Sequence, residues 1–298
     1  MKNLAPIVLF TYKRLETLQK TISALISNSS ATQTNLIIYS DGAKNEEDQI
    51  IIEKIRNYLK TITGFKSVRI IASNSNKGLA ASIIHGVSEV MTEYHKAIVL
   101  EDDLITSTNF LDFMNQALEQ YQNNPEILSI SGYSPIIKDL SNNEIYYTQR
   151  ASSWGWACWE DRWKEIDWEV KGYESFKKDK QAKKRFNAMG SDMTLMMQRQ
   201  MNGTLNSWAI RFCFHQFQNN LYSVHPASSK IQNVGFAEKY ATNTVQNYNR
   251  FHSELDTSNT IDFNFDKKVQ LEKDIIKQFI KDNSLKARIL NRIWNLLS

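Results

Sequence analysis

The sequence AIVLEDD, residues 97–103, places three acidic side chains directly after a short apolar run. Residues 97–100 are typical of a buried β-strand, because strands covered on both faces read as short continuous apolar runs. Glu101, Asp102 and Asp103 follow, and neighbouring carboxylates repel one another unless solvent or a cation compensates their charge. The stretch therefore predicts a buried strand that ends at a strongly acidic edge.

The sequence around this strand alternates between short apolar runs and segments with helical spacing. Further apolar runs predict strands at residues 5–10, 36–39, 68–72, 127–130 and 145–148. Apolar residues recur every three or four positions elsewhere, which predicts helices at residues 14–26, 46–62, 79–91, 109–121, 177–188 and 193–201. Such alternation is typical of an α/β fold with a mixed, mostly parallel, Rossmann-like sheet and helices on both faces.

Polar residues follow the predicted strands, at the edge where parallel sheets bind their ligands. Asp41 follows one strand, and the acids of residues 101–103 follow another. Carboxylates bind Mg²⁺ or Mn²⁺, which often take only one or two of them and bind substrate phosphates as well. Arg14 and Lys77 are the cations that a diphosphate needs at the same edge. The alternative is a set of solvated surface charges, with Asp41 as a turn-forming residue before a glycine.

Length and composition describe an ordinary globular protein. The chain has 298 residues, 42% hydrophobic and 23% charged, which predicts one large domain or two tightly joined ones. Its net charge of +4 is too small to argue for nucleic-acid binding. Cys158 and Cys213 are too few for a disulfide framework and lack zinc-site spacing, which favours a reduced cytoplasmic location. No apolar run approaches the roughly 20 residues that span a bilayer, and the first residues do not resemble a signal peptide.

Several common catalytic motifs are absent from the sequence. It contains no G-x-G-x-x-G, G-x-x-x-x-G-K, H-E-x-x-H or G-x-S-x-G motif. Dinucleotide oxidoreductases, P-loop enzymes, zinc proteases and α/β-hydrolases therefore lose their main support.

Tryptophans gather in one region, where residues 154–168 contain five of the seven in the chain. Trp154 and Trp156 flank Gly155, and aromatic rings beside polar neighbours suit the C–H faces and hydroxyl rim of a sugar. The alternative is core packing, since tryptophans are mostly buried.

Taken together, these pieces resemble the nucleotide-diphospho-sugar transferases with a GT-A fold. They are most similar to bacterial family 2-like glycosyltransferases and, more loosely, to the N-acetylglucosaminyltransferase I type. The likeness covers about residues 4–235, and its specificity comes from the order and spacing of the pieces. These are VLFTYKR at 8–14, SDG at 40–42, NKGL at 76–79, VLEDDL at 99–104 and WGW at 154–156.

The resemblance implies a role for each matching residue. Asp103 would be the direct ligand of Mn²⁺ or Mg²⁺ in a D-x-D-like element, and Asp41 would read the uracil. His225 lies in a stretch expected to fold back over the phosphates and is a further metal candidate. The residues implied on the sugar and acceptor side are Trp154, Gly155, Trp156, Asn206 and Trp208. The residues implied at the nucleotide and its phosphates are Thr11, Arg14, Asp41, Asn76, Lys77, Gly78, Glu101 and Asp102.

The sequence departs from the family pattern at the catalytic base. An inverting transferase needs a carboxylate that takes the proton of the acceptor hydroxyl. The resemblance leads us to expect an acid directly before a Ser-Trp-Ala-Ile-Arg stretch, and here Asn206 precedes Ser207. An amide cannot act as a base, so Asp192 and Asp161 are the candidates for this role.

These observations predict a metal-dependent, inverting glycosyltransferase that moves a hexosyl or N-acetylhexosaminyl group from a UDP-sugar. The acceptor would be a glycan or a lipid-linked oligosaccharide in the synthesis of a bacterial surface polysaccharide. Two alternatives stay open: a catalytically impaired nucleotide-sugar or glycan-binding protein, and a sugar nucleotidyltransferase. We expect the GT-A domain to span residues 1–265, with a nucleotide-sugar-binding half at 1–130 and an acceptor half at 131–265.

Residues 266–298 are expected to form a helix followed by a basic amphipathic helix. From residue 267 onward the segment has eight basic and three acidic residues, and its apolar residues, Trp294 among them, recur at helical spacing. This pattern is typical of a helix in a membrane interface, and packing on the domain or on a second subunit is the alternative. We therefore expect a cytoplasmic protein whose tail holds it at the inner membrane face.

Overall fold

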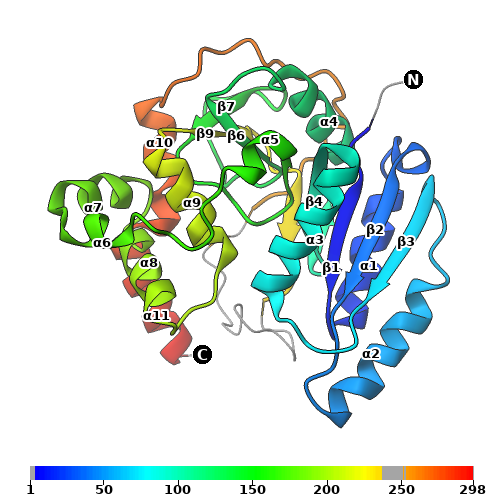
Figure 1. The fold of residues 1–298 in the computed structure, drawn as a ribbon. Coiled ribbons are helices and arrows are strands. Elements are labelled where there is room, and N and C mark those ends of the chain that lie inside the picture. The colour runs from blue at the N-terminus through cyan, green and yellow to red at the C-terminus, as the bar shows by residue number, and fades with distance from the viewer. Residues whose placement is uncertain (1–3, 237–250, 252, 298) are drawn as a thin grey trace.

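The computed structural model describes residues 4–236, 251 and 253–297, and one eight-stranded sheet lies at its centre (Figure 1). The strand order is β3-β2-β1-β4-β8-β6-β9-β7. The neighbours β3, β2, β1 and β4 run parallel, β8 is antiparallel to β4 and β6, and β7 is antiparallel to β9. The strands are β1 (Ile7–Thr11), β2 (Asn35–Ser40), β3 (Ser67–Ala72), β4 (Lys96–Glu101), β6 (Ile127–Ser131), β7 (Ile145–Thr148), β8 (Trp156–Trp159) and β9 (Tyr222–Pro226).

Helices cover both faces of this sheet because the side chains of its inner strands are buried on both sides. In β1, Ile7 and Leu9 pack into one apolar layer, whereas Val8 and Phe10 pack into the other. The first layer holds α1 (Leu15–Ile26), α2 (Glu46–Leu59) and α4 (Phe110–Gln120). The second holds α3 (Leu79–Tyr94), α5 (Glu160–Lys164) and α9 (Trp208–Gln218). The predicted mixed, mostly parallel α/β architecture is confirmed.

Strand β8 corrects the prediction that residues 154–156 form one loop at a pocket wall. Trp156 begins β8 and is only 2% exposed. Its ring stacks on Trp163 and Trp208, with centroid distances of 5.5 and 4.8 Å. Trp156 therefore belongs to the hydrophobic core, where both faces of the sheet are covered.

The region after β8 forms a small helical layer beside the sheet. The single helix expected at 177–188 is two helices, because Asp179 caps the second one by accepting the N–H groups of Gln181 and Ala182. These helices, α6 (Tyr173–Lys178) and α7 (Lys180–Phe186), are followed by η2 (Asn187–Met189) and then pack with α8 (Met193–Met201) and α9. The expected helix at 193–201 is confirmed.

A small two-stranded sheet joins the acidic edge to a distant part of the chain. Strand β5 (Leu104–Thr106) pairs antiparallel with β10 (Ile231–Asn233). Just beyond β10, the N–H of Val234 donates to the carbonyl oxygen of Asp103 at 2.9 Å. The segment after β10 is thereby held against the end of β4, although about 130 residues separate the two in the sequence. One short helical turn, η1 (Ala31–Gln33), precedes β2.

The C-terminal segment folds back onto the second half of the sheet (Figure 1). It forms α10 (Lys273–Phe279), η3 (Lys281–Asn283) and α11 (Leu285–Leu297), which confirms the two expected helices. Ile275 and Phe279 are buried against Tyr146 of β7. Among the residues that the structure describes, no helix combines the length and hydrophobicity required to cross a bilayer.

Candidate active site

A cavity of about 440 Å³ opens where β1, β2 and β4 end, at the edge that the sequence indicates. We call it the sheet-edge cavity. It brings together most of the predicted site residues from six separate stretches of the chain. Those that line it are Thr11, Arg14, Asp41, Asn76, Gly78, Glu101, Asp102, Asp103, Trp154, Asn206 and Trp208.

The two aspartates of the acidic edge make different contacts. Asp102 Oδ2 accepts the Thr11 hydroxyl at 2.8 Å and the Tyr12 N–H at 3.1 Å, while Asp102 Oδ1 lies 2.6 Å from the Arg14 guanidinium. Asp103 Oδ2 lies 2.8 Å from the same guanidinium. Asp103 Oδ1 is buried and has no hydrogen-bond partner among the described residues. Asp102 therefore fastens the end of β1, whereas Asp103 keeps one oxygen available to a ligand.

One cation, Arg14, faces three carboxyl groups at this edge. Burial alone would lower the pKa of Arg14, but Asp102 and Asp103 outweigh it and raise that pKa. Burial raises the pKa of Asp103, with Arg14 opposing the shift and Asp102 adding to it. Burial and then Asp103 also raise the pKa of Glu101. The edge therefore has an excess of negative charge that a further cation can relieve.

The acidic edge fits a hard divalent cation that keeps substrate as part of its shell. Among residues 4–236, 251 and 253–297, no group of three or more His, Cys, Asp or Glu side chains forms a complete metal site. Mg²⁺ and Mn²⁺ are nevertheless commonly held by one or two carboxylates together with substrate phosphates. The unpaired, buried Oδ1 of Asp103 is an oxygen of this kind, so the residues present match such a site.

Asp41 shapes the opposite wall of the cavity through four accepted hydrogen bonds. Its Oδ1 accepts the N–H groups of Gly42 and Lys77 at 2.8 and 2.9 Å. Its Oδ2 accepts the Gly78 N–H and the Asn76 side-chain amide, both at 3.0 Å. These bonds hold the turn into α3, where Gly78 adopts a φ of 76° that favours glycine. Asp41 thus organises the loop, and Lys77 contributes its backbone while its side chain is exposed.

Sequence reasoning missed several residues that lie at this cavity. Tyr12, Tyr39 and Lys44 also line it. Tyr12 follows β1 and Tyr39 is the last residue but one of β2, so their positions at the ends of predicted strands could have identified them. Gly235 gave no such signal. A Cβ atom at Gly235 would lie 2.1 Å from Asp103 Oδ2, so only glycine allows the backbone to pass this close to the carboxylate.

A second cavity, of about 360 Å³, adjoins the first and contains Asp192. The Asp192 carboxylate binds Arg150 in a bidentate pair, with distances of 2.8 and 3.1 Å. Ser153, Trp154, Met196 and Ala209 line both cavities. Asp192 is therefore separated from the acidic edge by Trp154 and its neighbours, within reach of a ligand that occupies the second cavity.

The structure removes Asp161 and His225 from the site. The side chain of Asp161 is 73% exposed on α5 and lines neither cavity. His225 is fully buried in β9, with its ring nitrogens 2.8 Å from the Tyr133 carbonyl oxygen and 3.1 Å from Thr148 Oγ1. Burial lowers the pKa of His225 to about 4. The expectation that His225 is a metal ligand beside Asp103 is therefore wrong, because its nitrogens already have partners within the core.

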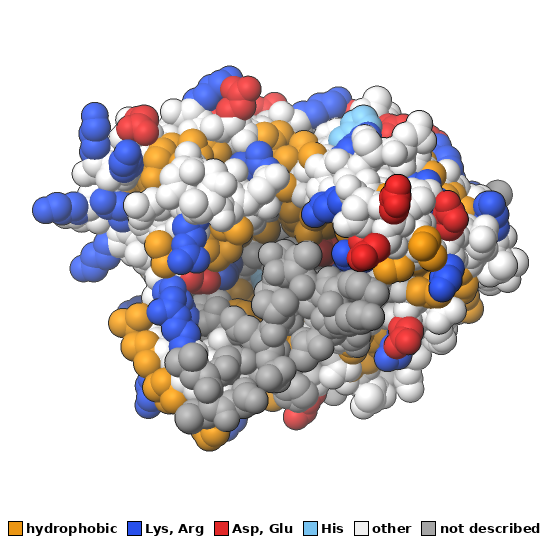
Figure 2. All heavy atoms as spheres, turned by 90° about the horizontal axis from the view of Figure 1, so that it is seen from below, with side chains coloured by type: hydrophobic (Ala, Val, Ile, Leu, Met, Phe, Trp, Pro, Cys, Tyr) orange, Lys and Arg blue, Asp and Glu red, His pale blue; other side chains and the backbone are white. Residues whose placement is uncertain are grey.

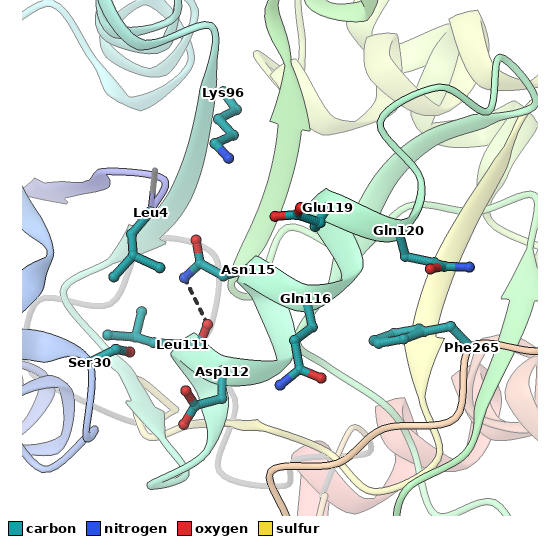
Figure 3. Close-up of a pocket in the computed structure, with 10 residues that line it drawn as sticks. All are labelled: Leu4, Ser30, Lys96, Leu111, Asp112, Asn115, Gln116, Glu119, Gln120 and Phe265. Atoms are coloured by element: carbon teal, nitrogen blue, oxygen red, sulfur yellow. Dashed lines mark hydrogen bonds between the residues drawn. The ribbon is translucent and has the colours of Figure 1, made fainter. Parts of the chain in front are cut away.

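A third cavity, of about 250 Å³, lies at the opposite ends of the strands and gathers no comparable cluster (Figure 3). Leu4, which precedes β1, and Lys96, which begins β4, mark its position. The side chains of α4 that face it are mainly polar and spread apart, and Asn115 donates to the Leu111 carbonyl oxygen of its own helix (Figure 3). The two adjoining cavities are therefore the candidate active site.

Comparison with solved structures finds distant similarities. The chain is similar over 47% of its length to S. aureus TarS, at 10% identity, covering 24% of that chain with a TM-score of 0.31. The S. aureus TarS 1-349 structure matches over 47% of this chain and 39% of its own, at 11% identity and a TM-score of 0.31. The mannosyltransferase PcManGT from Pyrobaculum calidifontis, in complex with GDP-Man and Mn²⁺, matches over 54% of this chain and 48% of its own, at 8% identity and a TM-score of 0.36. The chain thus covers less than half of the length of each structure, and such low TM-scores carry no argument about function.

Comparison with protein families gives a direct assignment. No curated protein sequence matches the chain. The model described as Glycosyl transferase family 2 matches residues 7–191, a span that contains β1 to β4, the acidic edge and Trp154. This match confirms the resemblance to family 2-like transferases with a GT-A fold. Because it spans more than half of the chain, the protein belongs to glycosyl transferase family 2.

Proposed function

We propose that the protein is a metal-dependent, inverting glycosyltransferase that takes a hexosyl or N-acetylhexosaminyl group from a UDP-sugar. The proposal rests on one observation above all: Asp103 presents a buried carboxylate oxygen without a partner among the described residues, inside a cavity at the sheet edge. Membership of the family supports glycosyl transfer over the nucleotidyltransferase alternative. A glycan or lipid-linked oligosaccharide is the acceptor that we propose.

Different residues of the sheet-edge cavity bind different parts of the donor. The loop that Asp41 holds forms the nucleotide side, and Arg14 stands beside the acidic edge with a planar set of donors suited to phosphate oxygens. Asp103 would hold Mn²⁺ or Mg²⁺, and the cation would supply electrostatic stabilisation for the leaving nucleoside diphosphate. Trp154 separates this diphosphate side from the second cavity, which leaves the sugar at the junction of the two.

Asp192 is the carboxylate that we propose as the general base. Asn206 lines the sheet-edge cavity, but its amide cannot take a proton. Asp192 is a carboxylate on the acceptor side, where it forms an ion pair with Arg150. Arg150 also fixes the orientation of the carboxylate through two bonds.

A screen of nucleotide sugars for thermal stabilisation, with and without Mn²⁺, tests this function. UDP-sugars are expected to raise the melting temperature more than GDP- or CDP-sugars, and more strongly in Mn²⁺. The stabilising donor is then incubated with the enzyme alone, because a competent donor site releases some free UDP. Stabilisation without any hydrolysis or transfer would support the binding-protein alternative, and the absence of stabilisation by any nucleotide sugar would overturn the donor site.

Replacing Asp41 with asparagine is expected to weaken UDP binding about tenfold or more. The amide presents N–H groups where the carboxylate now accepts four hydrogen bonds, so the loop at residues 76–78 loses its anchor. Hydrogen bonds to charged groups contribute about 1.5–3 kcal/mol each, and a tenfold change in affinity corresponds to about 1.4 kcal/mol. Calorimetric titration with UDP measures the effect. Asp161→Asn is the matched control, and equal UDP affinity in Asp41→Asn and in this control would contradict the assignment.

The C-terminal helix α11 supports a membrane-bound location. It exposes an apolar row, with Ile293 46% and Trp294 56% exposed, on a segment rich in basic residues. Hydrophobic side chains also gather beside Lys and Arg at one edge of the molecular face in Figure 2. We propose that this helix rests on the inner face of the cytoplasmic membrane, where a lipid-linked acceptor is found.

Deleting residues 284–298 is expected to reduce binding to anionic vesicles while UDP binding is retained. Basic residues near such a surface contribute about 1 kcal/mol each, so binding of the full-length protein should also weaken as salt rises. Vesicle co-sedimentation at low and high salt measures both effects. The milder variant Ile289→Ser changes an exposed side chain and should show the same direction. A full-length protein that ignores anionic vesicles at low salt would show that α11 has a purely structural role.

A further inference from the structure

The second cavity has a wall that the family match does not include. The cavity lies between the C-terminal segment and the helical layer of α8 and α9, which come together on one side of the molecule (Figure 1). Phe279 of α10, with Asp282 and Asn283 of η3, closes it. Its volume of about 360 Å³ falls in the range of about 300–1,000 Å³ that is typical of small-molecule sites. The C-terminal segment therefore does more than extend the fold, because it completes a cavity.

This cavity adjoins the sheet-edge cavity across a shared wall. Trp154 lines both of them, together with Ser153, Met196 and Ala209. A molecule in the second cavity therefore approaches the proposed donor sugar past the edge of the Trp154 ring. Asp192, the proposed base, lies on the same side as that molecule.

Aromatic rings form the apolar part of the cavity. Trp154 makes edge-to-face contacts with Tyr133, Phe236 and Phe251, at centroid distances of 4.8, 6.0 and 5.9 Å. All four rings line the cavity. Rings held at right angles to one another leave both faces and edges to a ligand, which suits the C–H surfaces of a pyranose.

Asn283 supplies a side-chain amide at the wall of this cavity. Its carbonyl oxygen accepts the N–H and the hydroxyl of Ser191, at 3.1 and 2.9 Å, so the backbone anchors the tail. Its side chain lines the cavity, and the residue is only 7% exposed. The Oδ1 atom has no hydrogen-bond partner among the described residues, which is rare for a buried amide oxygen. An O–H or N–H donor of a ligand would satisfy it.

The charges around the cavity select against an anion. Arg150 is the one Lys or Arg among the described residues that line the cavity, and it is already paired with Asp192. A phosphate or carboxylate ligand would therefore find no unpaired cation among these residues, whereas a hydroxyl-rich neutral ring needs none. We propose that the second cavity binds the acceptor as an uncharged sugar ring, with a hydroxyl or acetamido N–H donated to Asn283 Oδ1. This inference rests on the proposed transferase function.

Saturation-transfer NMR of the full chain with simple glycosides tests the inference. The probes are the methyl glycosides of glucose, galactose, mannose and N-acetylglucosamine, with glucose 6-phosphate as the charged comparison. At least one neutral glycoside is expected to bind, and Asn283→Leu should weaken that binding tenfold or more because it removes the acceptor at similar volume. Asn283→Ala is the second variant, in case leucine disturbs the packing of η3.

The controls separate this cavity from the donor site and from the stability of the tail. Asn291→Leu alters another buried asparagine of the C-terminal segment that does not line the cavity, and it should leave glycoside binding unchanged. Asp103→Ala should also leave it unchanged. Glycoside binding in a protein that fails to bind UDP would overturn the proposed function and keep the cavity. The inference would be overturned if no neutral glycoside binds or if glucose 6-phosphate binds more tightly than the neutral glycosides. It would also be overturned if both Asn283 variants bind the glycoside as tightly as the unmodified protein does.

Discussion

The Asp103→Ala variant is expected to lose sugar transfer and the Mn²⁺-dependent part of UDP binding. Asp103 Oδ1 is buried at the acidic edge without a hydrogen-bond partner among the described residues, so its removal would take away the ligand that we propose for the cation. Mutating even the outer partners of metal ligands costs about 10- to 100-fold in affinity or activity, and a direct ligand should cost at least about 100-fold. Titration of UDP with and without Mn²⁺, together with transfer rates, measures the loss.

Asp102 provides the matched comparison for this prediction. It fastens Thr11, Tyr12 and Arg14, so Asp102→Asn should lower the melting temperature of the metal-free protein. Loss of such buried bonds costs about 1–3 kcal/mol. Asp103→Ala should change that temperature less, because Arg14 keeps Asp102 as a partner and the repulsion between neighbouring acids falls. Unchanged UDP affinity of Asp103→Ala in Mn²⁺ would refute the metal assignment.

The Asp192→Asn variant is expected to slow transfer by about 10²- to 10⁴-fold, the usual contribution of a general base, with UDP binding intact. The amide keeps the shape of the carboxylate but cannot take the proton of the acceptor. Asp192 lines the second cavity and not the sheet-edge cavity, so the donor should bind as before. Transfer rates at saturating donor, and UDP titration in Mn²⁺, separate the two effects.

A stability measurement must accompany Asp192→Asn. The substitution leaves Arg150 without its counter-charge, and breaking a buried ion pair in this way costs about 3–5 kcal/mol. Thermal unfolding therefore identifies the temperature at which the variant remains folded, and the rates are compared there. Asp161→Asn, on the exposed face of α5, should retain both stability and activity. Full transfer activity in folded Asp192→Asn would assign the base to another residue.

The parallel half of the sheet could be predicted from the sequence because its signals are local. Apolar runs of strand length alternate with helical spacing, and each period depends only on neighbouring residues. The acidic edge follows from the same pattern, since Glu101 ends a buried strand and Asp102 and Asp103 come directly after it. Strand β8 was missed although residues 156–159 form a short continuous apolar run like the other buried strands, because its first tryptophan was interpreted as part of a sugar-pocket wall.

The sequence thus determined which residues lie at the strand ends, whereas the tertiary structure decided which contacts each of them makes. The residue pattern alone does not separate Asp102 from Asp103, and only the family resemblance singled out Asp103. Their contacts differ because Thr11, Arg14 and Gly235 arrive from other parts of the chain. Asn283 likewise reaches the second cavity only because the tail folds back onto Ser191. Such contacts depend on which surfaces are packed together, and local periodicity carries no information about that choice.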